Sequence, residues 1–294
     1  MFLLINYFLN IITEKHDFFN QKLLNSAKKY VTLKKIKKGG SCVKERLSCI
    51  MDIGEAMLVN GAEVYRVEDS IKRMCTAFGA SRIDIFTITS NMTATVFTSD
   101  GESYTQTRRI TSSGTDFEKL HRLNRLSRMI CENNHLSVKE VEEELAKALA
   151  CKTYPFWAEC LCYALIAGAF TLFFGGGIIE AAVGFVIGCA LRFAVLFSDR
   201  VVINKIFAKF FASFVMTLLA VLFHRLGIIP NIDKVIIGNI MILIPGIGFT
   251  NAMRDLFTGD SIAGLLRLIE AVLIALAIAA GYFLVITITG GLGI

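Results

Sequence analysis

Five long apolar blocks fill the second half of the chain. Each block has about the length that an α-helix needs to cross a hydrocarbon core about 30 Å thick, since a helix rises about 1.5 Å per residue. The blocks cover residues 158–175, 178–197, 206–224, 235–250 and 262–289, and the fourth is the shortest. Tight connections follow the first and third blocks, at Gly175–Gly177 and Pro230–Asn231. The pattern predicts an all-α bundle of five transmembrane helices.

Residues 41–155 have the pattern of a water-soluble domain. Apolar residues recur at helical spacing over 41–60 and 67–78, and again over 117–130 and 138–149. Between these pairs the period falls to two, over 83–85, 92–99 and 103–110, with Asp100–Gly101 as a hairpin turn signal. Ser137 and Glu140 have the spacing of a capping box. The order of two helices, three strands and two helices predicts an α+β domain with a small antiparallel sheet.

The first forty residues form an extension of different character. Residues 1–12 are apolar but too few to span a bilayer, and no basic leader precedes them. Six lysines follow between residues 28 and 38. Because lysine-rich segments are attracted to anionic lipid, we expect this extension to lie near a membrane surface or to be disordered. The expected divisions are 1–40, 41–155 and 156–294, with the main boundary near Pro155.

Composition supports a membrane-embedded second half. The chain is 54% hydrophobic with a mean hydropathy of +0.57, more than an ordinary soluble protein carries. Only 8 of the 31 basic and 7 of the 25 acidic residues lie after residue 155. Much of the net charge of +6 comes from the lysine run, so nucleic acid is not an expected partner. The 8 cysteines lack a paired metal-binding spacing, and we expect reduced thiols, no metal and no cofactor.

The charges beside the apolar blocks predict an orientation in the cell membrane. The segment before the first block is basic, and the 198–205 connection carries Arg200 and Lys205, whereas the 175–180 connection carries Glu180. By the positive-inside rule, the 41–155 domain is cytoplasmic and, after five spans, Ile294 lies outside. Arg192 is near the inner end of the second block, and we expect it to extend toward that interface.

Helix breakers and charges interrupt the apolar pattern between residues 245 and 270. Pro245, Gly246 and Gly248 predict a break in the fourth helix, which neighbouring protein or a water-filled cavity must satisfy at membrane depth. The stretch contains Asn251 and five charged residues, Arg254, Asp255, Asp260, Arg267 and Glu270. Because ions are costly inside a membrane, these residues are candidates for substrate binding or proton coupling.

Two other interpretations stay open for the same residues. Arg254, Asp255 and Asp260 also fit a cytoplasmic loop between the fourth and fifth helices. Arg267 and Glu270 are three residues apart, so they also fit a structural ion pair on one helix face.

A second polar cluster lies where the second predicted helix begins. It follows Asn60 and contains Gly61, Glu63, Arg66, Glu68 and Asp69. A solvated helix face with intrahelical ion pairs would explain the charges. Glu63 and Glu68 could instead form an acid/base pair. No activated nucleophile, metal set or oxyanion loop accompanies them, so no catalytic residue is assigned.

Two motifs in the sequence resemble the threonine/serine exporter family. They are the segments 60–69 and 245–270, and the likeness covers roughly residues 41–290. Long members of that family carry ten spans, whereas this chain has five predicted ones. The resemblance therefore implies the large-subunit form, which needs a separate small membrane subunit and forms an oligomer.

The resemblance also implies a function. It points to a subunit of a proton-coupled secondary exporter of threonine and serine, not an enzyme, with roles for the polar residues of both motifs. Arg267 or Arg254 would bind the substrate carboxylate, and Asp255, Asp260 or Glu270 would exchange the proton. Two-subunit relatives are linked to dicarboxylate export, so a succinate-like substrate is the alternative. A membrane-anchored hydrolase, or a soluble half that only docks the small subunit, are further hypotheses.

Overall fold

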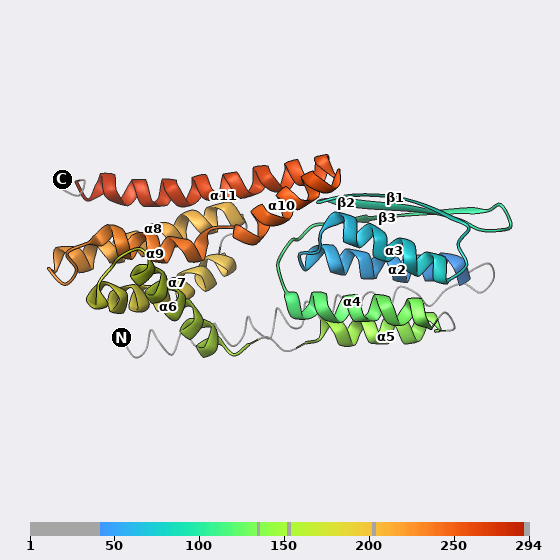
Figure 1. Ribbon diagram of the computed structural model, residues 1–294, viewed down its shortest axis with the longest axis horizontal. Coiled ribbons are helices and arrows are strands. Elements are labelled where there is room, and N and C mark those ends of the chain that lie inside the picture. The colour runs from blue at the N-terminus through green and yellow to red at the C-terminus, as the bar shows by residue number, and fades with distance from the viewer. Residues whose placement is uncertain (1–41, 134–135, 152–153, 202–203, 291–294) are drawn as a thin grey trace. The chain divides into compact units, whose positions relative to one another are not determined.

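The computed structural model describes residues 42–133, 136–151, 154–201 and 204–290 (Figure 1). The predicted 1–40 extension lies outside these residues. The described chain is mostly helical and contains a three-stranded sheet. It divides into two compact units. The first contains Val67–Phe86, Asn91–Cys151 and the described residues up to Ala62, and the second contains Glu63–Arg66, Thr87–Ser90 and the described part of Lys152–Ile294.

The elements of the first half follow the predicted order. They are α2 (Cys42–Val59), α3 (Val64–Ala77), β1 (Arg82–Ile88), β2 (Asn91–Phe97), β3 (Ser103–Arg109), α4 (Phe117–Glu132) and α5 (Val138–Leu149). The capping box is confirmed, because Ser137 and Glu140 bond each other's backbone at the start of α5.

The three strands form one sheet in the order β1-β2-β3. Strands β2 and β3 are antiparallel, with Asn91 opposite Arg109 and Phe97 opposite Ser103. The predicted turn is confirmed, although the loop is longer than two residues: the Thr98 N–H donates to the Glu102 carbonyl at 2.9 Å. Gly101 has φ +82°, a left-handed conformation that glycine adopts without a steric penalty.

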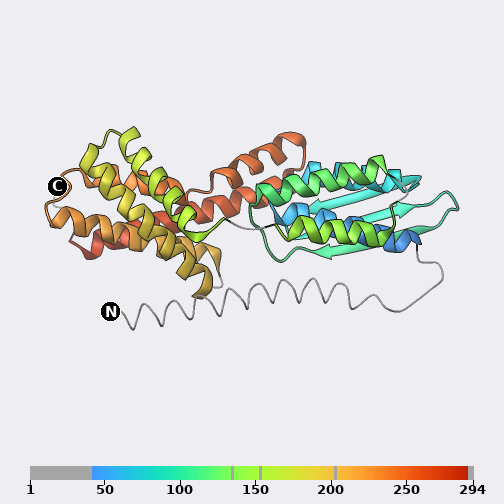
Figure 2. The same cartoon turned by 90° about the horizontal axis from the view of Figure 1, so that it is seen from below.

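Helix α2 lies in the middle of the first unit, between the sheet and the α4–α5 pair (Figures 1 and 2). Ile50, Met51 and Met57 are at most 1% exposed. A Cβ on Gly54 would lie 2.6 Å from the Ile71 side chain, so glycine permits the close approach of α3. The sequence predicted a helix with one apolar face. That was incomplete, since layers on two sides bury α2.

A polar network joins α2 to the sheet. Arg108 of β3 places Nε 2.9 Å from Asp52 Oδ1 and 4.0 Å from Glu55 Oε2. Its Nη2 donates to Ser48 Oγ at 2.9 Å. Burial raises the pKa of Glu55, and repulsion from Asp52 adds to this, against the opposing attraction of Arg108. Two acids therefore share one cation under the sheet.

Glu55→Gln is expected to stabilise the protein at pH 7 by up to about 1 kcal/mol. Because the pKa of folded Glu55 lies above its usual value of 4.5, its ionised form lowers the free energy of unfolding above that pH. The cost disappears as the pH falls below 4.5, so the stabilities of variant and wild type should converge there. Denaturant unfolding at several pH values measures this, with the exposed Glu143→Gln as control. A variant less stable than wild type at pH 7 would contradict it.

The second unit contains the apolar helices. They are α6 (Phe156–Phe173), α7 (Ile178–Val201), α8 (Lys205–Arg225), α9 (Ile232–Leu243), α10 (Gly246–Thr258) and α11 (Ser261–Ile288). Among the described residues, four helices are long and apolar enough to cross a membrane: α6, the Ile178–Ser198 part of α7, α8 and α11. Helices α9 and α10 together are also long and apolar enough to cross a membrane, but the pair is bent by 54°. The chain is thus a multi-pass membrane protein with four such helices, or five if the bent pair is one span.

The predicted break in the fourth helix is present and lies between Leu243 and Gly246. Helix α9 ends at Leu243, and Gly246 already begins α10, with Gly248 inside its first turn. Proline disfavours helical conformation in the residue before it and lacks an N–H, so it ends one helix and suits the start of the next.

Small residues let the apolar helices pack closely. A Cβ on Gly238 of α9 would lie 2.7 Å from Thr171 N of α6. A Cβ on Gly281 of α11 would lie 2.4 Å from the Phe210 carbonyl oxygen of α8. Such contacts are typical of membrane helices, where packing replaces the hydrophobic effect.

Candidate functional site

Helices α10 and α11 form a tight helical hairpin (Figure 1). Gly259 turns the chain between them with φ +99°. Gly264 of α11 faces α10 so closely that a Cβ would lie 2.9 Å from the Ala252 carbonyl oxygen. This approach brings the polar residues of the two helices together.

The hairpin holds a buried ion pair between Asp255 and Arg267. Asp255 of α10 is fully buried, and Arg267 of α11 is 13% exposed. Arg267 Nη1 lies 3.1 Å from Asp255 Oδ2. Removing two charges from water is costly, so a pair of this kind is weak evidence for stability and stronger evidence for a specific role.

The segment Glu63–Arg66, which includes the first turn of α3, belongs to the same compact unit and completes the site. The Val64 N–H donates to Asp255 Oδ1 at 3.3 Å. Glu63 forms an ion pair with Arg254, which precedes Asp255 on α10. These contacts join residues that are 191 positions apart in the sequence. We call the group the α10–α11 charge cluster; its members are Glu63, Val64, Arg254, Asp255 and Arg267.

The two oxygens of Asp255 are satisfied differently. Oδ1 accepts the Val64 N–H, but 3.3 Å is long for such a hydrogen bond. Oδ2 is close to Arg267, yet it has no hydrogen bond of good geometry among the described residues. The contact with Arg267 is therefore mainly a charge attraction. A fully buried carboxylate held this loosely is costly, and such groups gather at functional sites.

The other residues predicted from the 245–270 stretch lie around this cluster. Arg254 and Asp255 are helical, so the loop interpretation is wrong for them. Asp260 lies at the turn between α10 and α11, where burial raises its pKa above the usual 3.8. Asn251 is half-buried on α10, and Glu270 is exposed on α11. The predicted Arg267 side chain pairs with Asp255 of the other helix.

The predicted cluster at the start of α3 is divided in the structure. Glu63 contacts Arg254, whereas Asp69 pairs with Arg73 four residues later at 2.8 Å, as a solvated helix face would. Arg66 is exposed and Glu68 is half-buried. Gly61 has φ +96°, a glycine conformation, just before α3 begins.

A further ion pair, between Glu159 of α6 and Arg192 of α7, was missed in the sequence. Arg192 Nε lies 2.8 Å from Glu159 Oε2, and its guanidinium lies over the rings of Phe156 and Tyr163. Arg192 is therefore paired with a residue of a neighbouring helix, and its extension toward the interface stays a prediction. Each partner lies fourteen residues from the α6–α7 connection, a symmetry that could have revealed the pair.

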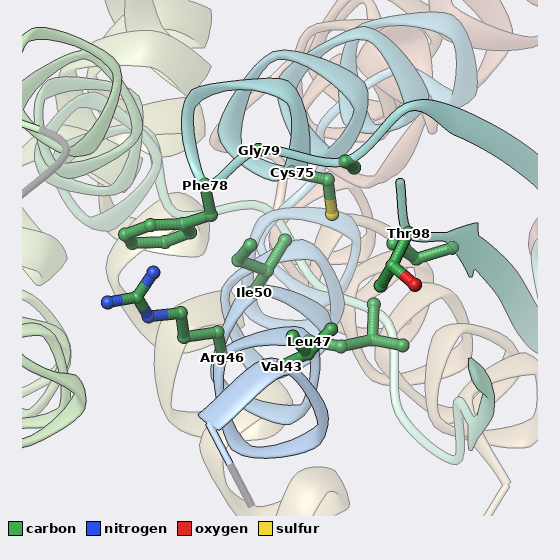
Figure 3. A pocket seen from close by; sticks show the side chains of 10 residues that line it. Val43, Arg46, Leu47, Ile50, Cys75, Phe78, Gly79 and Thr98 are labelled. Carbon is green, nitrogen blue, oxygen red and sulfur yellow. The ribbon is translucent and has the colours of Figure 1, made fainter. Parts of the chain in front are cut away.

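A pocket in the first unit does not compete as a site. Figure 3 shows the Arg46 guanidinium beside the Phe78 ring, 4.7 Å from its centroid, with Cys75 and Thr98 across the opening. Its volume is about 40 Å³, enough for a few water molecules but too small for a solute. Burial raises the pKa of Cys75 to about 12, so its thiol is unreactive at neutral pH.

The charge cluster suits the binding of a small ion better than covalent chemistry. It offers guanidinium groups for a carboxylate, and carboxylates that exchange protons or attract an ammonium group. The described residues contain no group of three metal-binding side chains.

Comparison with known proteins gives a family and several relatives. The family model described as "Putative threonine/serine exporter" matches residues 48–289. The chain is 28% identical over 237 residues to "Probable succinate transporter subunit YjjP" of Klebsiella aerogenes, covering 80% of this chain and 90% of that protein. The protein of the same name from Escherichia coli is 26% identical over 240 residues, covering 81% and 92%.

A third relative matches over a similar length of this chain. "Pheromone-regulated membrane protein 10" of Eremothecium gossypii is 25% identical over 250 residues, which cover 81% of this chain but 32% of that protein. No solved structure matches the chain.

Proposed function

Because this chain belongs to the threonine/serine exporter family, we propose that it is one subunit of a secondary transporter for a small solute that carries a carboxylate. The α10–α11 charge cluster is the observation that supports this most strongly. It sets a buried Asp255–Arg267 pair beside a bent helix pair, in a unit made of membrane-capable helices. Broken helices that present polar groups are a common way to build a solute site within a membrane.

The first candidate substrates are threonine and serine, as the family description indicates. An amino acid needs one site for its carboxylate and another for its ammonium group. Arg267 would bind the first, and Asp255 or Asp260 the second. The names of two relatives favour succinate as the second candidate, for which Arg254 and Arg267 would bind the two carboxylates.

Proton coupling is the second part of the proposal. Asp255, Asp260 and Glu270 are the groups that could carry the proton, and Asn251 lies on the same helix as Asp255. The raised pKa of Asp260 supports this, since a carboxyl that is harder to ionise takes up a proton more readily.

The proposal includes a partner and an orientation. Two relatives are named as subunits, so a separate small membrane subunit would complete the transport path. In the proposed orientation, residues 41–155 form a cytoplasmic domain, residues 156–294 cross the cytoplasmic membrane, and the C-terminus is outside. Hydrolysis is disfavoured, because Arg254 already pairs with Glu63, one member of the candidate acid/base pair.

Solute movement in liposomes tests the proposal. The chain and its candidate small subunit are reconstituted together, and labelled threonine, serine and succinate are followed with and without an imposed pH gradient. Amino acid movement that requires the gradient supports the first candidate, and movement of succinate alone supports the second. No movement of any of the three, in vesicles that contain both folded subunits, would contradict a transport function.

A further inference from the structure

The Val64 amide and Arg267 form two sides of a receptor for a carboxylate. Val64 is the first residue of α3, a helix of 14 residues, and the first N–H groups of a helix lack intrahelical partners. Helix N-termini therefore attract anions. Arg267, at 13% exposure, supplies a full positive charge on the other side.

This receptor already contains a carboxylate, that of Asp255. Oδ1 of Asp255 faces the Val64 N–H, and Oδ2 faces Arg267 Nη1, at 3.3 and 3.1 Å. Both contacts come from groups that a free carboxylate would also use. The spacing of the N–H and the guanidinium therefore suits the two oxygens of one carboxylate.

Asp255 fits the receptor imperfectly. It is fully buried, yet Oδ2 has no hydrogen bond of good geometry among the described residues, and the Oδ1 contact is long. A mobile carboxylate can turn to make both contacts well, whereas Asp255 is constrained by helix α10. Exchange of one carboxylate for another also keeps the charge at Arg267 balanced.

From these contacts we propose that the solute's carboxylate binds between the Val64 amide and Arg267 by displacing the side chain of Asp255. Asp255 is then an internal competitor that fills the receptor in the empty protein. That the solute carries a carboxylate rests on the proposed function. The new step is that this carboxylate takes the place of the Asp255 side chain. Displacement would also remove the contact between α10 and the first turn of α3.

Succinate binding to the full chain in detergent micelles tests the exchange. If Asp255 fills the receptor in nine of ten molecules, Asp255→Ala should bind succinate about tenfold more tightly than wild type. Arg267→Ala in the same background should abolish that binding. The exposed Asp233→Ala, on α9, is the matched control and should leave the affinity unchanged. Should Asp255→Ala fold poorly, Asp255→Ser removes the same charge.

Hydrogen exchange at the Val64 amide gives an independent readout. In Asp255→Ala this amide should exchange about tenfold or more faster than in wild type, and saturating succinate should restore the slow rate. In Asp255→Ala/Arg267→Ala, succinate should not slow the exchange of the Val64 amide. The same measurement is made with threonine. An amide that neither solute protects, or a wild type that binds both as tightly as Asp255→Ala does, would overturn the inference.

The outcomes separate this inference from the transport function. Movement of a solute by the wild type, without protection of the Val64 amide by that same solute in Asp255→Ala, leaves the transporter and removes the exchange. Protection without solute movement keeps the carboxylate receptor and contradicts transport.

Discussion

Arg267→Ala is expected to lower the free energy of unfolding by about 3–5 kcal/mol, the usual cost of removing one partner of a buried ion pair. Asp255 would remain fully buried without its cation, and its Oδ2 has no hydrogen bond of good geometry among the described residues to compensate. Denaturant unfolding of the purified chain in one detergent measures the change.

The double variant Asp255→Ala/Arg267→Ala is the decisive comparison. It removes both charges, so its loss should be clearly smaller than that of Arg267→Ala alone. Arg225→Ala is the control, because Arg225 is exposed at the end of α8 and should cost less than about 1 kcal/mol. A double variant as unstable as the single one would show that Asp255 and Arg267 do not depend on each other.

Gly281→Ala is expected to lower the free energy of unfolding by about 2 kcal/mol. Its Cβ would lie 2.4 Å from the Phe210 carbonyl oxygen and 3.1 Å from Phe214 N, both backbone atoms of α8. Backbone atoms within a helix cannot move aside as a side chain does, so α8 and α11 must separate. The same unfolding measurement detects the loss.

Gly246→Ala is the matched control for Gly281→Ala. Gly246 begins α10, and beyond its immediate chain surroundings a Cβ at this position would meet no atom of the described residues within 4 Å. Alanine favours helix over glycine, so this variant should be neutral or slightly more stable. Equal losses in both variants would mean that close contact with α8 is not what requires glycine at 281.

The candidate site could be predicted from the sequence only in part. Arg267 and Asp255 stand out because charges are rare in apolar segments. Their pairing could not be read from spacing, since i,i+3 neighbours on one helix suggested Glu270 as the partner of Arg267. The actual contact depends on the Gly259 turn and the close approach at Gly264, which bring α10 against α11.

Contacts between distant segments were beyond the reach of periodicity. The Val64 amide is a backbone group, so no side-chain pattern marks it, and Glu63 lies 191 residues from Arg254. The Glu159–Arg192 pair is different. Equal distances from a short connection place two residues side by side on antiparallel helices, and that rule would have found it.

The fold was predicted more completely than the site. Local signals such as Asp100–Gly101, Ser137 and Pro245 each mark a boundary through their own backbone or side-chain chemistry, and each boundary is present. The burial of α2 on two sides was not predicted, because the half-buried Asp52 and Glu55 make that helix look amphipathic. Their inward-facing partner, Arg108, lies on β3, far away in the sequence.

Solute movement by two charge-balanced variants tests most directly whether the α10–α11 charge cluster is the transport site. Asp255→Ala/Arg267→Ala removes the buried ion pair of the cluster, and Glu159→Gln/Arg192→Gln removes the ion pair between α6 and α7. In liposomes with the small subunit, we expect the first variant to fall to the level of empty vesicles and the second to retain transport. Transport by the first variant at the rate of the second would contradict the assignment of the site.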